Sequence, residues 1–398
     1  MIPLPEGFKE MIRSLPGIEA EKLLESLDAQ PQVAVRLNKR KHAAIFEDAE
    51  KVSWCESGRY LENRPDFILD PLLHAGAYYV QDPSSMIYET VVENLVRLFP
   101  SDNPRLKILD LCAAPGGKTT AIINGVPDGS FIVANEISSK RVNALEENLS
   151  RWGYPYISIT NHDSSYFGRQ GENFDIVAVD APCSGEGMMR KDNDARTQWS
   201  EQLICKCSSL QKEILFNAAN ALKPGGFLIY STCTFNRKEN EENAEFINNE
   251  LGMEAVNLSF PEEWNIQKGI ETKLPVYRFF PHKIKGEGLF LCIFRKPGEW
   301  VDNSVQNRTD RKTKPEKTEI PDINEILSVN FDRGKYPMVE IDKEKALSYL
   351  RRESIILDSS APKGIVIVTY KGWPLGAAKN IGTRANNLYP KNRRILKR

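Results

Sequence analysis

The sequence predicts an α/β protein whose central domain is a doubly wound, Rossmann-like parallel sheet. Short apolar runs suited to buried strands alternate with amphipathic helical patterns through the middle of the chain, and this alternation is typical of parallel sheets. One run, Leu106–Leu111, is followed by a turn with two adjacent glycines, Gly116 and Gly117, and then by a helical pattern. Such units bind nucleotide-like ligands at the carboxyl edge of open sheets. At 398 residues the chain is too long for one compact core, so we expect two or three domains.

Residues 1–75 are predicted to form a small α+β extension at the N-terminus. Their pattern indicates short helices over Phe8–Leu15 and Ala20–Leu27 and a strand over Gln32–Asn38. The segment is too small to bury a deep core of its own. We therefore expect it to pack against the domain that follows.

Residues 76–297 are predicted to form the Rossmann-like domain. The expected elements are a helix over Ser84–Phe99, strands at Leu106–Leu111 and Phe131–Val133, a helix from Val142 to Trp152 that Gly153 ends, a strand over Phe174–Asp180, a helix from Leu210 to Leu222 that Lys223-Pro224-Gly225-Gly226 ends, and strands over Phe227–Ser231 and Leu289–Phe294. Because helices separate these strands, we expect the strands to run parallel.

The C-terminal part is predicted to be a linker over residues 298–321 and a small β-rich domain over residues 322–398. The linker is polar and poor in apolar side chains, whereas the domain has a strand pattern over Gly364–Tyr370 and the turn-rich stretch KGWPLGAAKNIG. Residues 363–398 carry nine Lys and Arg and no Asp or Glu, while the whole chain has a net charge of −1, so the other residues sum to −10. This basic end predicts an anionic partner, most simply nucleic acid, and a solvated tail is the alternative.

The composition indicates a globular protein of the cytoplasm. Hydrophobic residues make up 41% and charged residues 27% of the chain, and no apolar run reaches membrane-spanning length. The N-terminus lacks the layout of a signal peptide. The seven cysteines are an odd number and show no metal-ligand pairs apart from Cys205 and Cys207, which favours free thiols in a reducing compartment. We expect neither a membrane partner nor a metal site.

The glycine turn allows several interpretations. Gly117-Lys118-Thr119 resembles the end of a phosphate-binding P-loop, with Ile176–Asp180 as its partner strand, but the P-loop needs a glycine where Cys112 stands. The G-x-G-x-x-G pattern of a dinucleotide site is also absent. A site for S-adenosylmethionine fits better, because Glu136 ends the next strand-like run, where an acidic residue reaches ribose hydroxyls. A buried turn without a ligand is the remaining alternative.

Two cysteines follow neighbouring strands at the edge where ligands bind. Asp180-Ala181-Pro182-Cys183-Ser184-Gly185 follows one buried strand, and Ser231-Thr232-Cys233-Thr234 follows the next. We expect both thiols in one cleft, where an ionised thiol is a strong nucleophile. The other five cysteines are interpreted as small buried hydrophobes.

A nucleophilic thiol suits the methylation of a pyrimidine carbon. Carbon 5 of cytosine is a poor nucleophile, but addition of a thiolate at carbon 6 makes it enamine-like and able to take a methyl group. Loss of the carbon 5 proton then expels the thiol, so one hard step is split into easier ones. The chemistry alone does not decide which cysteine attacks.

Several of these stretches carry a resemblance to a known family. The matching stretches are Arg36-Leu37-Asn38, YYVQDPSSM, DLCAAPGGKTT, Glu136, DAPCSGEGMMRK, STCTFNRKENEEN and Pro281-His282 with GEGLF after an insert. Over about residues 30–296 the chain resembles the NOL/NOP/Sun-type RNA 5-methylcytosine methyltransferases. The terminal GWPLGAAKNIGTRANNLYP is similar to the PUA-like, RNA-binding end of the small-subunit ribosomal RNA methyltransferase F group.

The resemblance implies roles for individual residues. Cys233 is the nucleophile, Cys183 helps to release the methylated RNA, and Asp180 lies between the cofactor and the target base. S-adenosylmethionine has its ribose at Glu136 and its adenine edge at Asp163. The implied cofactor-binding residues are Cys112, Ala113, Ala114, Pro115, Gly116, Gly117, Lys118, Glu136, Asp163 and Asp180.

The resemblance also implies RNA as the partner, in the form of small-subunit (16S) ribosomal RNA bound by a monomeric enzyme. Arg190 and Lys191 either guide the RNA backbone or lie in a solvated loop, and the lone His282 is interpreted as structural. The same chemistry on transfer RNA, a P-loop nucleotide hydrolase and a non-catalytic RNA-binding assembly factor are the alternatives.

Overall fold

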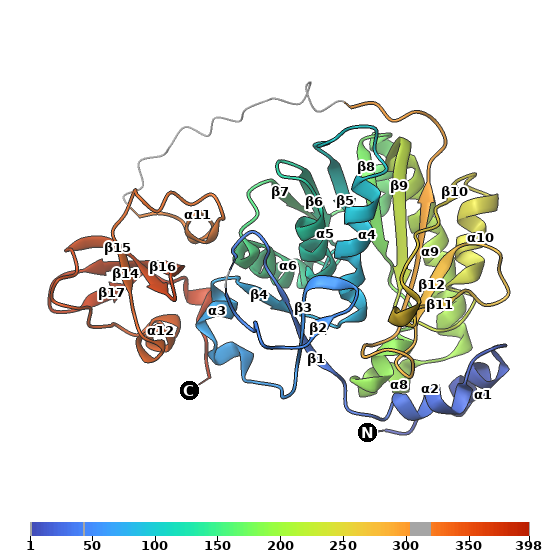
Figure 1. Cartoon of the computed structure of the whole chain (residues 1–398), viewed down its shortest axis with the longest axis horizontal. Coiled ribbons are helices and arrows are strands. Elements are labelled where there is room, and N and C mark those ends of the chain that lie inside the picture. The colour runs from blue at the N-terminus through green and yellow to red at the C-terminus, as the bar shows by residue number, and fades with distance from the viewer. Residues whose placement is uncertain (1, 43, 303–319, 398) are drawn as a thin grey trace.

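The computed structural model describes residues 2–42, 44–302 and 320–397, and the strands in these ranges form three sheets. A nine-stranded sheet lies at the centre, a four-stranded sheet of the N-terminal part packs beside it, and a second four-stranded sheet lies at the C-terminal end (Figure 1). Most of the predicted linker, at residues 303–319, falls outside the described residues. Among the helices that the structure describes, none is long and apolar enough to cross a membrane.

The N-terminal extension contains both predicted helices and the predicted strand. Its elements are α1 (Glu6–Ser14), α2 (Ala20–Ser26), β1 (Val33–Leu37), β2 (Lys51–Val52), β3 (Cys55–Leu61), η1 (Phe67–Leu69), α3 (Pro71–His74) and β4 (Tyr78–Val80). The strands form an antiparallel sheet in the order β2-β3-β1-β4. Phe8 and Ile12 of α1 pack in one cluster with Trp199 and Phe280 of the central domain. As expected, the extension is buried against its neighbour.

The central domain alternates strands and helices in the predicted order. Its elements are η2 (Ser84–Met86), α4 (Ile87–Val96), β5 (Lys107–Asp110), α5 (Gly117–Gly125), β6 (Phe131–Asn135), α6 (Ser139–Trp152), β7 (Ile157–Thr160), α7 (Ser164–Gln170), β8 (Phe174–Asp180), η3 (Glu186–Arg190), α8 (Asn193–Gln198), α9 (Glu201–Ala221), β9 (Leu222–Thr232), α10 (Glu241–Asn249), β10 (Glu254–Ala255), η4 (Glu262–Trp264), β11 (Gln267–Lys268), β12 (Val276–Phe279) and β13 (Leu289–Arg295). The order along the sheet is β11-β12-β13-β9-β8-β5-β6-β7, with β10 beside β13. Helices cover both faces of this sheet (Figure 1), so its middle strands are buried on both sides.

The sheet is parallel only in part, which corrects the expectation of a wholly parallel sheet. Strands β9, β8, β5, β6 and β7 run parallel to one another. β13 runs antiparallel to β9, and β12 and β11 continue that antiparallel edge. A continuous apolar run indicates burial on both faces of a sheet but carries no information on strand direction, so the pattern of Leu289–Phe294 could not reveal this.

The helix α9 ends at Ala221, just before residues 223–226 as predicted, and these four residues belong to the strand that follows. β9 begins at Leu222, which pairs with Phe174, and an irregularity in register absorbs the extra residues before Phe227 pairs with Ile176. Gly225 has φ of +72°, and a Cβ added there would lie 2.6 Å from the backbone nitrogen of Trp300. Gly225 is therefore required because the backbone bulges there and Trp300 lies close to it.

The C-terminal module consists of α11 (Ile323–Leu327), β14 (Met338–Glu340), α12 (Lys343–Leu350), β15 (Gly364–Tyr370), β16 (Trp373–Asn380), β17 (Ala385–Asn387) and η5 (Lys391–Arg393). Strand β15 is where the sequence predicts it, but the turn-rich KGWPLGAAKNIG is mostly strand β16, paired antiparallel with β15. A Cβ added at Gly376 would lie 2.4 Å from the Tyr349 hydroxyl, so this glycine permits close packing.

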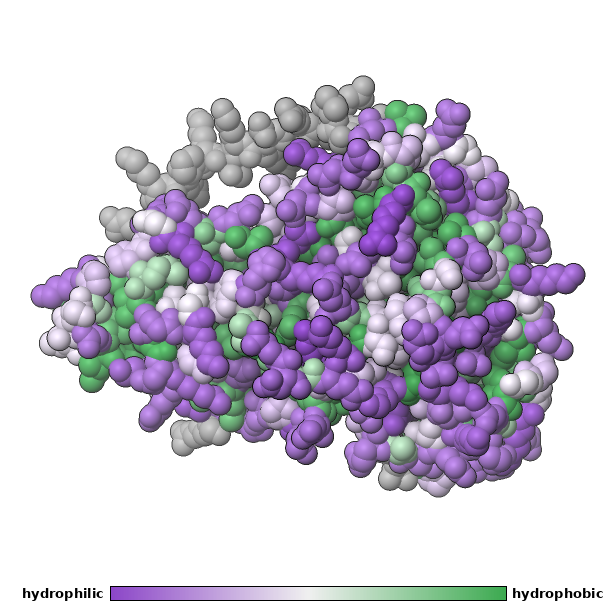
Figure 2. Space-filling view, in the orientation of Figure 1, coloured by the Kyte–Doolittle hydropathy of each residue, from purple (hydrophilic) through white to green (hydrophobic). Residues whose placement is uncertain are grey.

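The module packs against both preceding parts of the chain. Its core includes Ala75 from the N-terminal extension, next to α3. At the end of α6, a Cβ added to Gly153 would lie 2.1 Å from the carbonyl oxygen of Leu327, and Val329 donates its backbone N–H to Gly153 at 2.9 Å. The module lies at one end of the molecule, beside α3 and α6 (Figure 1). Hydrophilic side chains cover much of the face in Figure 2, with hydrophobic patches between them.

Candidate active site

Two cysteines meet at the carboxyl edge of the central sheet. β8 ends at Asp180 and β9 ends at Thr232, and the two strands are parallel neighbours. Cys183 and Cys233 lie in the loops that follow, and their sulfur atoms are 3.3 Å apart. Both side chains are partly exposed. The structure thus brings together the two thiols that the sequence analysis selected, at a place open to solvent.

Asp180 and Lys118 form an ion pair beside Cys233. The Lys118 ammonium lies 2.7 Å from Oδ2 of Asp180, and the Ser231 hydroxyl donates to Oδ1 at 2.8 Å. Burial acts to lower the pKa of Lys118, but the attraction of Asp180, together with that of Cys233, outweighs it and raises this pKa. Lys118 therefore stays protonated at neutral pH, and its positive charge lies near Cys233.

The surroundings distinguish the two thiols. Contact with the Cys233 sulfur and burial hold the pKa of Cys183 well above its usual range, and the Glu239 carboxylate adds to this effect. Cys183 is therefore a protonated thiol at neutral pH. Cys233 is the thiol of the pair that lies near the Lys118 ammonium. The protonated Cys183 thiol can therefore donate a hydrogen bond to the Cys233 sulfur, 3.3 Å away.

Two buried glutamates fix the loops that carry the cysteines. Glu239 accepts hydrogen bonds from the backbone N–H of Ser184 at 3.0 Å, from the Ser184 hydroxyl at 2.5 Å and from Gln211 at 2.7 Å. Glu186 accepts hydrogen bonds from the backbone N–H groups of Phe235 at 2.6 Å and Asn236 at 2.9 Å. Glu239, which follows Cys233 in the chain, therefore bonds the loop of Cys183, and Glu186, which follows Cys183, bonds the loop of Cys233. Neither role was predicted from the sequence, although acids this deeply buried require such partners.

The glycine turn between β5 and α5 lies at the same edge. Asp110, at the end of β5, is buried and accepts a hydrogen bond from the Thr119 hydroxyl at 2.6 Å, and burial raises the pKa of Asp110 to about 7. Gly116 has φ of +107°, which side chains disfavour, and it precedes the first residue of α5. A Cβ added at Gly117 would lie 3.2 Å from the Tyr79 ring. The turn needs its first glycine for conformation and its second for close packing.

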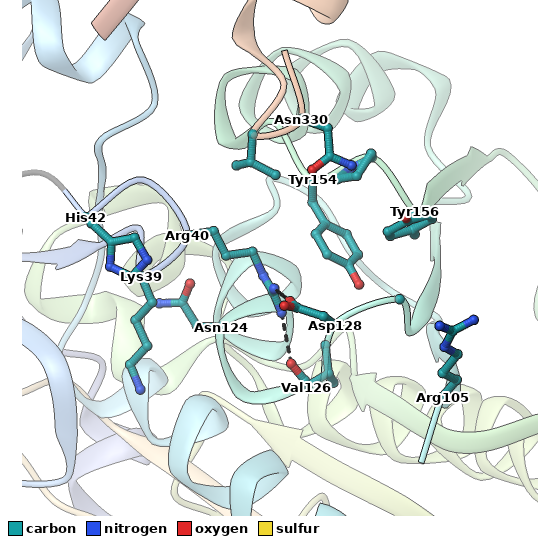
Figure 3. A pocket seen from close by; sticks show the side chains of 13 residues that line it. Lys39, Arg40, His42, Arg105, Asn124, Val126, Asp128, Tyr154, Tyr156 and Asn330 are labelled. Atoms are coloured by element: carbon teal, nitrogen blue, oxygen red, sulfur yellow. Dashed lines mark hydrogen bonds and ion pairs between the residues drawn. The ribbon is translucent and has the colours of Figure 1, made fainter. Parts of the chain in front are cut away.

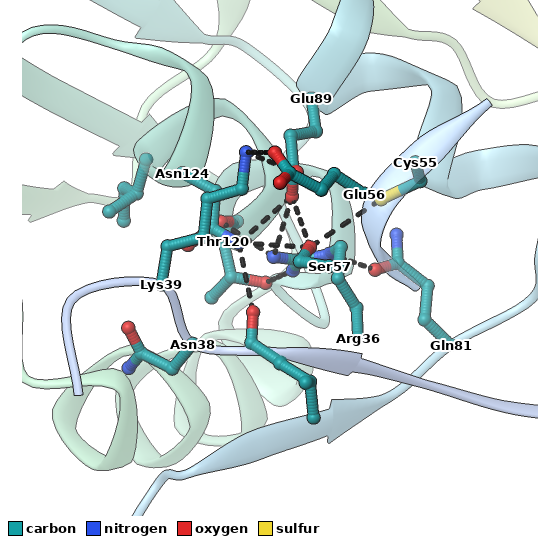
Figure 4. Close-up of polar contacts among 12 residues, drawn as sticks. Arg36, Asn38, Lys39, Cys55, Glu56, Ser57, Gln81, Glu89, Thr120 and Asn124 are labelled. Atoms are coloured by element: carbon teal, nitrogen blue, oxygen red, sulfur yellow. Dashed lines mark hydrogen bonds and ion pairs between the residues drawn. The ribbon is translucent and has the colours of Figure 1, made fainter. Parts of the chain in front are cut away.

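Arg36 fastens this turn to the N-terminal extension (Figure 4). Its guanidinium is fully buried and donates hydrogen bonds to the carbonyl oxygens of Gly117 at 3.2 Å and Thr120 at 3.1 Å, and to Gln81 at 2.7 Å. The Glu89 carboxylate lies 4.0 Å away and balances its charge. The stretches Arg36-Leu37-Asn38 and YYVQDPSSM, which carry the family resemblance without a predicted role, therefore support the turn from behind.

Replacing Arg36 by methionine should destabilise the protein by about 3 kcal/mol, because it leaves the buried Glu89 with one partner fewer and removes one donor from each of two backbone carbonyls. The free energy of unfolding from urea titration measures this loss. Arg59→Met is the matched control in β3, because its partly exposed guanidinium bonds, among the described residues, the carbonyls of its neighbours Glu56 and Gly58. We expect its effect to be within about 0.5 kcal/mol. Equal losses in the two variants would contradict the role given to Arg36.

Glu136 and Asp163 follow the next two strands of the same edge. Glu136 comes directly after β6, is buried and accepts a hydrogen bond from the backbone N–H of Ser138 at 2.8 Å through Oε1. Asp163 caps the N-terminus of α7, and its hydrogen bonds with Ser165 lower its pKa. The Asn135 side chain donates to the carbonyl of residue 162 at 2.9 Å, so the two loops are tied together.

These residues fit a nucleoside-bearing cofactor. Oε2 of Glu136 is buried and accepts no hydrogen bond from the described residues, so it can accept one from a ribose hydroxyl. The Arg141 guanidinium lies 3.2 Å from this oxygen and also donates to the carbonyl of Ala114, so it links Glu136 to the glycine turn. Ile137 is 64% exposed beside Glu136, an apolar surface that the sequence analysis missed and that suits a purine ring. No group of three metal-ligating side chains occurs within the described ranges.

Three further predicted residues lie outside this constellation. Arg190 is buried and donates hydrogen bonds to the carbonyls of Ala29 at 3.1 Å and Gln30 at 2.7 Å, so it ties the N-terminal extension to the cysteine loop and does not guide RNA. Lys191 is exposed and pairs with Glu287 at 3.0 Å. His282 packs beside the Phe280 ring, and burial lowers its pKa.

Family models match the chain in three successive parts. The N-terminal domain of 16S rRNA methyltransferase RsmF matches residues 4–83, 16S rRNA methyltransferase RsmB/F matches residues 95–295, and the methyltransferase RsmF PUA domain matches residues 336–395. The second model alone covers half of the chain. The chain belongs to the 16S rRNA methyltransferase RsmB/F family.

Individual members of this family are similar over most of their length. The ribosomal RNA small subunit methyltransferase F of Citrobacter koseri is 30% identical over 412 residues, which cover 85% of this chain and 84% of the relative. The protein of the same name from Shewanella oneidensis is 30% identical over 409 residues, with 86% and 85% covered.

Solved structures confirm the fold. NSun6 from Pyrococcus horikoshii, solved with SFG, superposes with a TM-score of 0.62 at 21% identity and covers 75% of this chain and 99% of that one. A methyltransferase homolog protein from the same organism gives a TM-score of 0.62 at 24% identity, with 73% and 95% covered. Membership of the RsmB/F family confirms the predicted resemblance, the Rossmann-like domain and the S-adenosylmethionine-dependent methyltransferase class, and it excludes the P-loop hydrolase.

Proposed function

We propose that the protein methylates carbon 5 of a cytosine in 16S ribosomal RNA, with Cys233 as the nucleophile and Cys183 assisting release. The observation that carries this proposal is the 3.3 Å separation of two thiols at the carboxyl edge of the sheet. One thiol would serve attack alone, whereas two adjoining thiols serve attack and departure. The family description, which names 16S rRNA, supports the substrate. We also propose a monomer, because one chain supplies the cysteines, the glycine turn and the basic module.

The residues of the site account for each step on the base. The thiolate of Cys233 adds its sulfur to carbon 6 while the electron pair of the 5,6 double bond moves to carbon 5. After methylation, carbon 5 loses its proton to solvent, the double bond re-forms and the bond from carbon 6 to sulfur breaks. The Cys183 thiol donates a hydrogen bond to the departing Cys233 thiolate, 3.3 Å away. Asp180 can accept a hydrogen bond from the exocyclic amine of the base. The base must first leave any stack in the RNA.

The cofactor site adjoins the cysteines through Lys118. When bound, S-adenosylmethionine supplies the electrophilic methyl group. Residues Cys112–Lys118 would hold its methionine part, Glu136 the ribose hydroxyls and Asp163 the adenine edge. The exposed Ile137 would cover the purine ring, which removes apolar surface from water.

Replacing Glu136 by glutamine should weaken S-adenosylmethionine binding by about tenfold to a hundredfold, because hydrogen bonds to a charged acceptor contribute about 1.5–3 kcal/mol. The KM for the cofactor measures this loss, and we expect kcat at saturating cofactor to change much less. Glu213→Gln, an exposed residue of α9, is the control for the removed charge. An unchanged KM in the Glu136 variant would exclude the ribose contact.

The substrate is tested by transfer of a labelled methyl group. Purified small ribosomal subunits, deproteinised 16S rRNA and bulk transfer RNA are each incubated with the enzyme and labelled S-adenosylmethionine, and the modified nucleoside is then identified. We expect 5-methylcytosine in 16S rRNA, free or in the subunit. Label confined to transfer RNA would support the alternative substrate and overturn this one, and a methylated base other than cytosine would overturn the thiol mechanism.

A further inference from the structure

A hollow of about 680 Å³ lies at the amino edge of the central sheet, the edge opposite the one that carries the cysteines. Figure 3 shows the residues that line it. Arg105 precedes β5, Gly129 precedes β6 and Tyr156 precedes β7, so all three line the hollow from the starts of parallel strands. Lys39, from the loop after β1, lines it from the N-terminal extension, and Asn330 lines it from the C-terminal module. All three parts of the chain therefore contribute to one hollow.

We propose that this hollow binds an unpaired nucleotide of the RNA substrate, away from the cytosine that reacts. The ligand is a phosphate with an unstacked base, recognised by one free guanidinium and one exposed aromatic ring. The inference rests on the proposed function only in taking RNA as the substrate. It adds a second point of attachment on the opposite edge of the sheet.

The basic residues of the hollow are not equivalent. The Lys39 ammonium pairs with Glu89 and Glu93, each at 2.8 Å, and Arg40 pairs with Asp128, so these two cations are already balanced. Arg105 is exposed and forms no hydrogen bond or ion pair with any residue in the described ranges. Its planar fork of donors is therefore free for a phosphate, which guanidinium groups bind in bidentate fashion.

A rigid aromatic surface lies on the same side of the hollow as Arg105 (Figure 3). Tyr156 is 45% exposed, and its ring meets the edge of Tyr154 at a centroid distance of 5.8 Å. Tyr154 is itself fixed, because its hydroxyl donates to the carbonyl of Ser130 at 2.6 Å and the Arg40 guanidinium covers its ring at 4.9 Å. An exposed ring held from behind is the kind of platform on which unpaired RNA bases stack.

The combination selects RNA over other anionic partners. An acidic peptide would satisfy Arg105 but brings no flat face for Tyr156, whereas a nucleotide supplies a phosphate and a base together. The amide of Asn330 adds a donor and an acceptor for base edges. A second hollow of about 860 Å³ shares Tyr154 and Asn330 and continues beside the C-terminal module towards Lys335. A single strand can therefore continue from the nucleotide site along the module.

The test compares RNA binding and methylation by the full-length enzyme and its Arg105→Glu/Tyr156→Ala variant. We expect the Kd for deproteinised 16S rRNA to weaken by about tenfold to a hundredfold, because stacking of one base and one phosphate contact are lost. The slope of log Kd against log salt should fall by about one. The kcat at saturating RNA should stay within about twofold of the wild type, because the cysteine edge is untouched.

Lys268→Glu is the matched control, because it changes the charge in the same way. Lys268 is exposed and lies in β11, at the end of the sheet opposite to β7. RNA substituted with 4-thiouridine should cross-link, on irradiation, to a peptide that contains Tyr156. The inference is wrong if the wild type binds and methylates 16S rRNA and the double variant has the same Kd as the wild type or as the Lys268→Glu control. The proposed function would stand in that case. A wild type that does not methylate RNA overturns the proposed function, and a kcat lost with unchanged Kd overturns the docking role alone.

Discussion

Alanine in place of Cys233 should abolish methyl transfer to RNA, while the fold and cofactor binding should persist. The variant lacks the sulfur that adds to carbon 6, and neither the Cys183 thiol nor water replaces it, because the first is held protonated and the second is a weak nucleophile. We expect the rate to fall by at least about a thousandfold, as for other essential nucleophiles. Labelled methyl transfer under single-turnover conditions measures the loss.

The matched control is Cys205→Ala, an exposed cysteine of α9 that lies outside the pair. This variant should keep full activity and separate the effect of Cys233 from a general need for thiols. Thermal unfolding of both variants should shift little, because Cys233 is only partly buried. Substantial activity in a folded Cys233→Ala enzyme would refute its role as the nucleophile.

Alanine in place of Cys183 has a different outcome, the accumulation of enzyme covalently joined to RNA. Attack by Cys233 does not need the second thiol, but departure of the Cys233 thiolate loses the hydrogen-bond donor that lies 3.3 Å away. The complex should resist heat and detergent and appear as a slowly migrating band on a denaturing gel. Nuclease treatment should return it to the size of the protein.

The double variant Cys183→Ala/Cys233→Ala is the control for this band. This variant also lacks the Cys183 donor, and in addition it lacks the attacking sulfur of Cys233. It should therefore form no covalent complex. A Cys183→Ala enzyme that turns over at the wild-type rate without any complex would show that release does not depend on this thiol. A complex that survives in the double variant would place the bond on another residue.

The sequence predicted the central strands well because their apolar runs report burial directly. Phe174–Asp180 coincides with β8, since every residue but the last is buried. The half-buried β7 was missed. Its four residues alternate apolar and polar as in a strand, but the run is short and all four side chains are only partly buried. The strand β16 was hidden by Pro374 and Gly376, residues typical of turns that here lie in a paired strand with Tyr349 packed against the glycine. Such features depend on neighbours that are distant in sequence.

The sequence predicted those parts of the site that directly follow the ends of strands. Two cysteines after neighbouring strands were expected in one cleft, and the structure places their sulfurs in contact. The supports of the site could not be foreseen in the same way. Glu239 bonds Ser184 across 55 positions of sequence, and Arg36 bonds Thr120 across 84 positions. Only the burial of charged side chains in polar stretches could have indicated them, and burial of such residues is set by the tertiary fold.

Trapping with 5-fluorocytidine tests the central claim most directly. RNA that carries this nucleoside at the target has no proton to lose from carbon 5, so the bond between carbon 6 and the attacking sulfur cannot be released. The wild-type enzyme with S-adenosylmethionine should form a stable complex, and mass spectrometry of the digest should find the nucleotide on Cys233. Attachment at Cys183, or no complex from an enzyme that methylates ordinary RNA, would contradict the account.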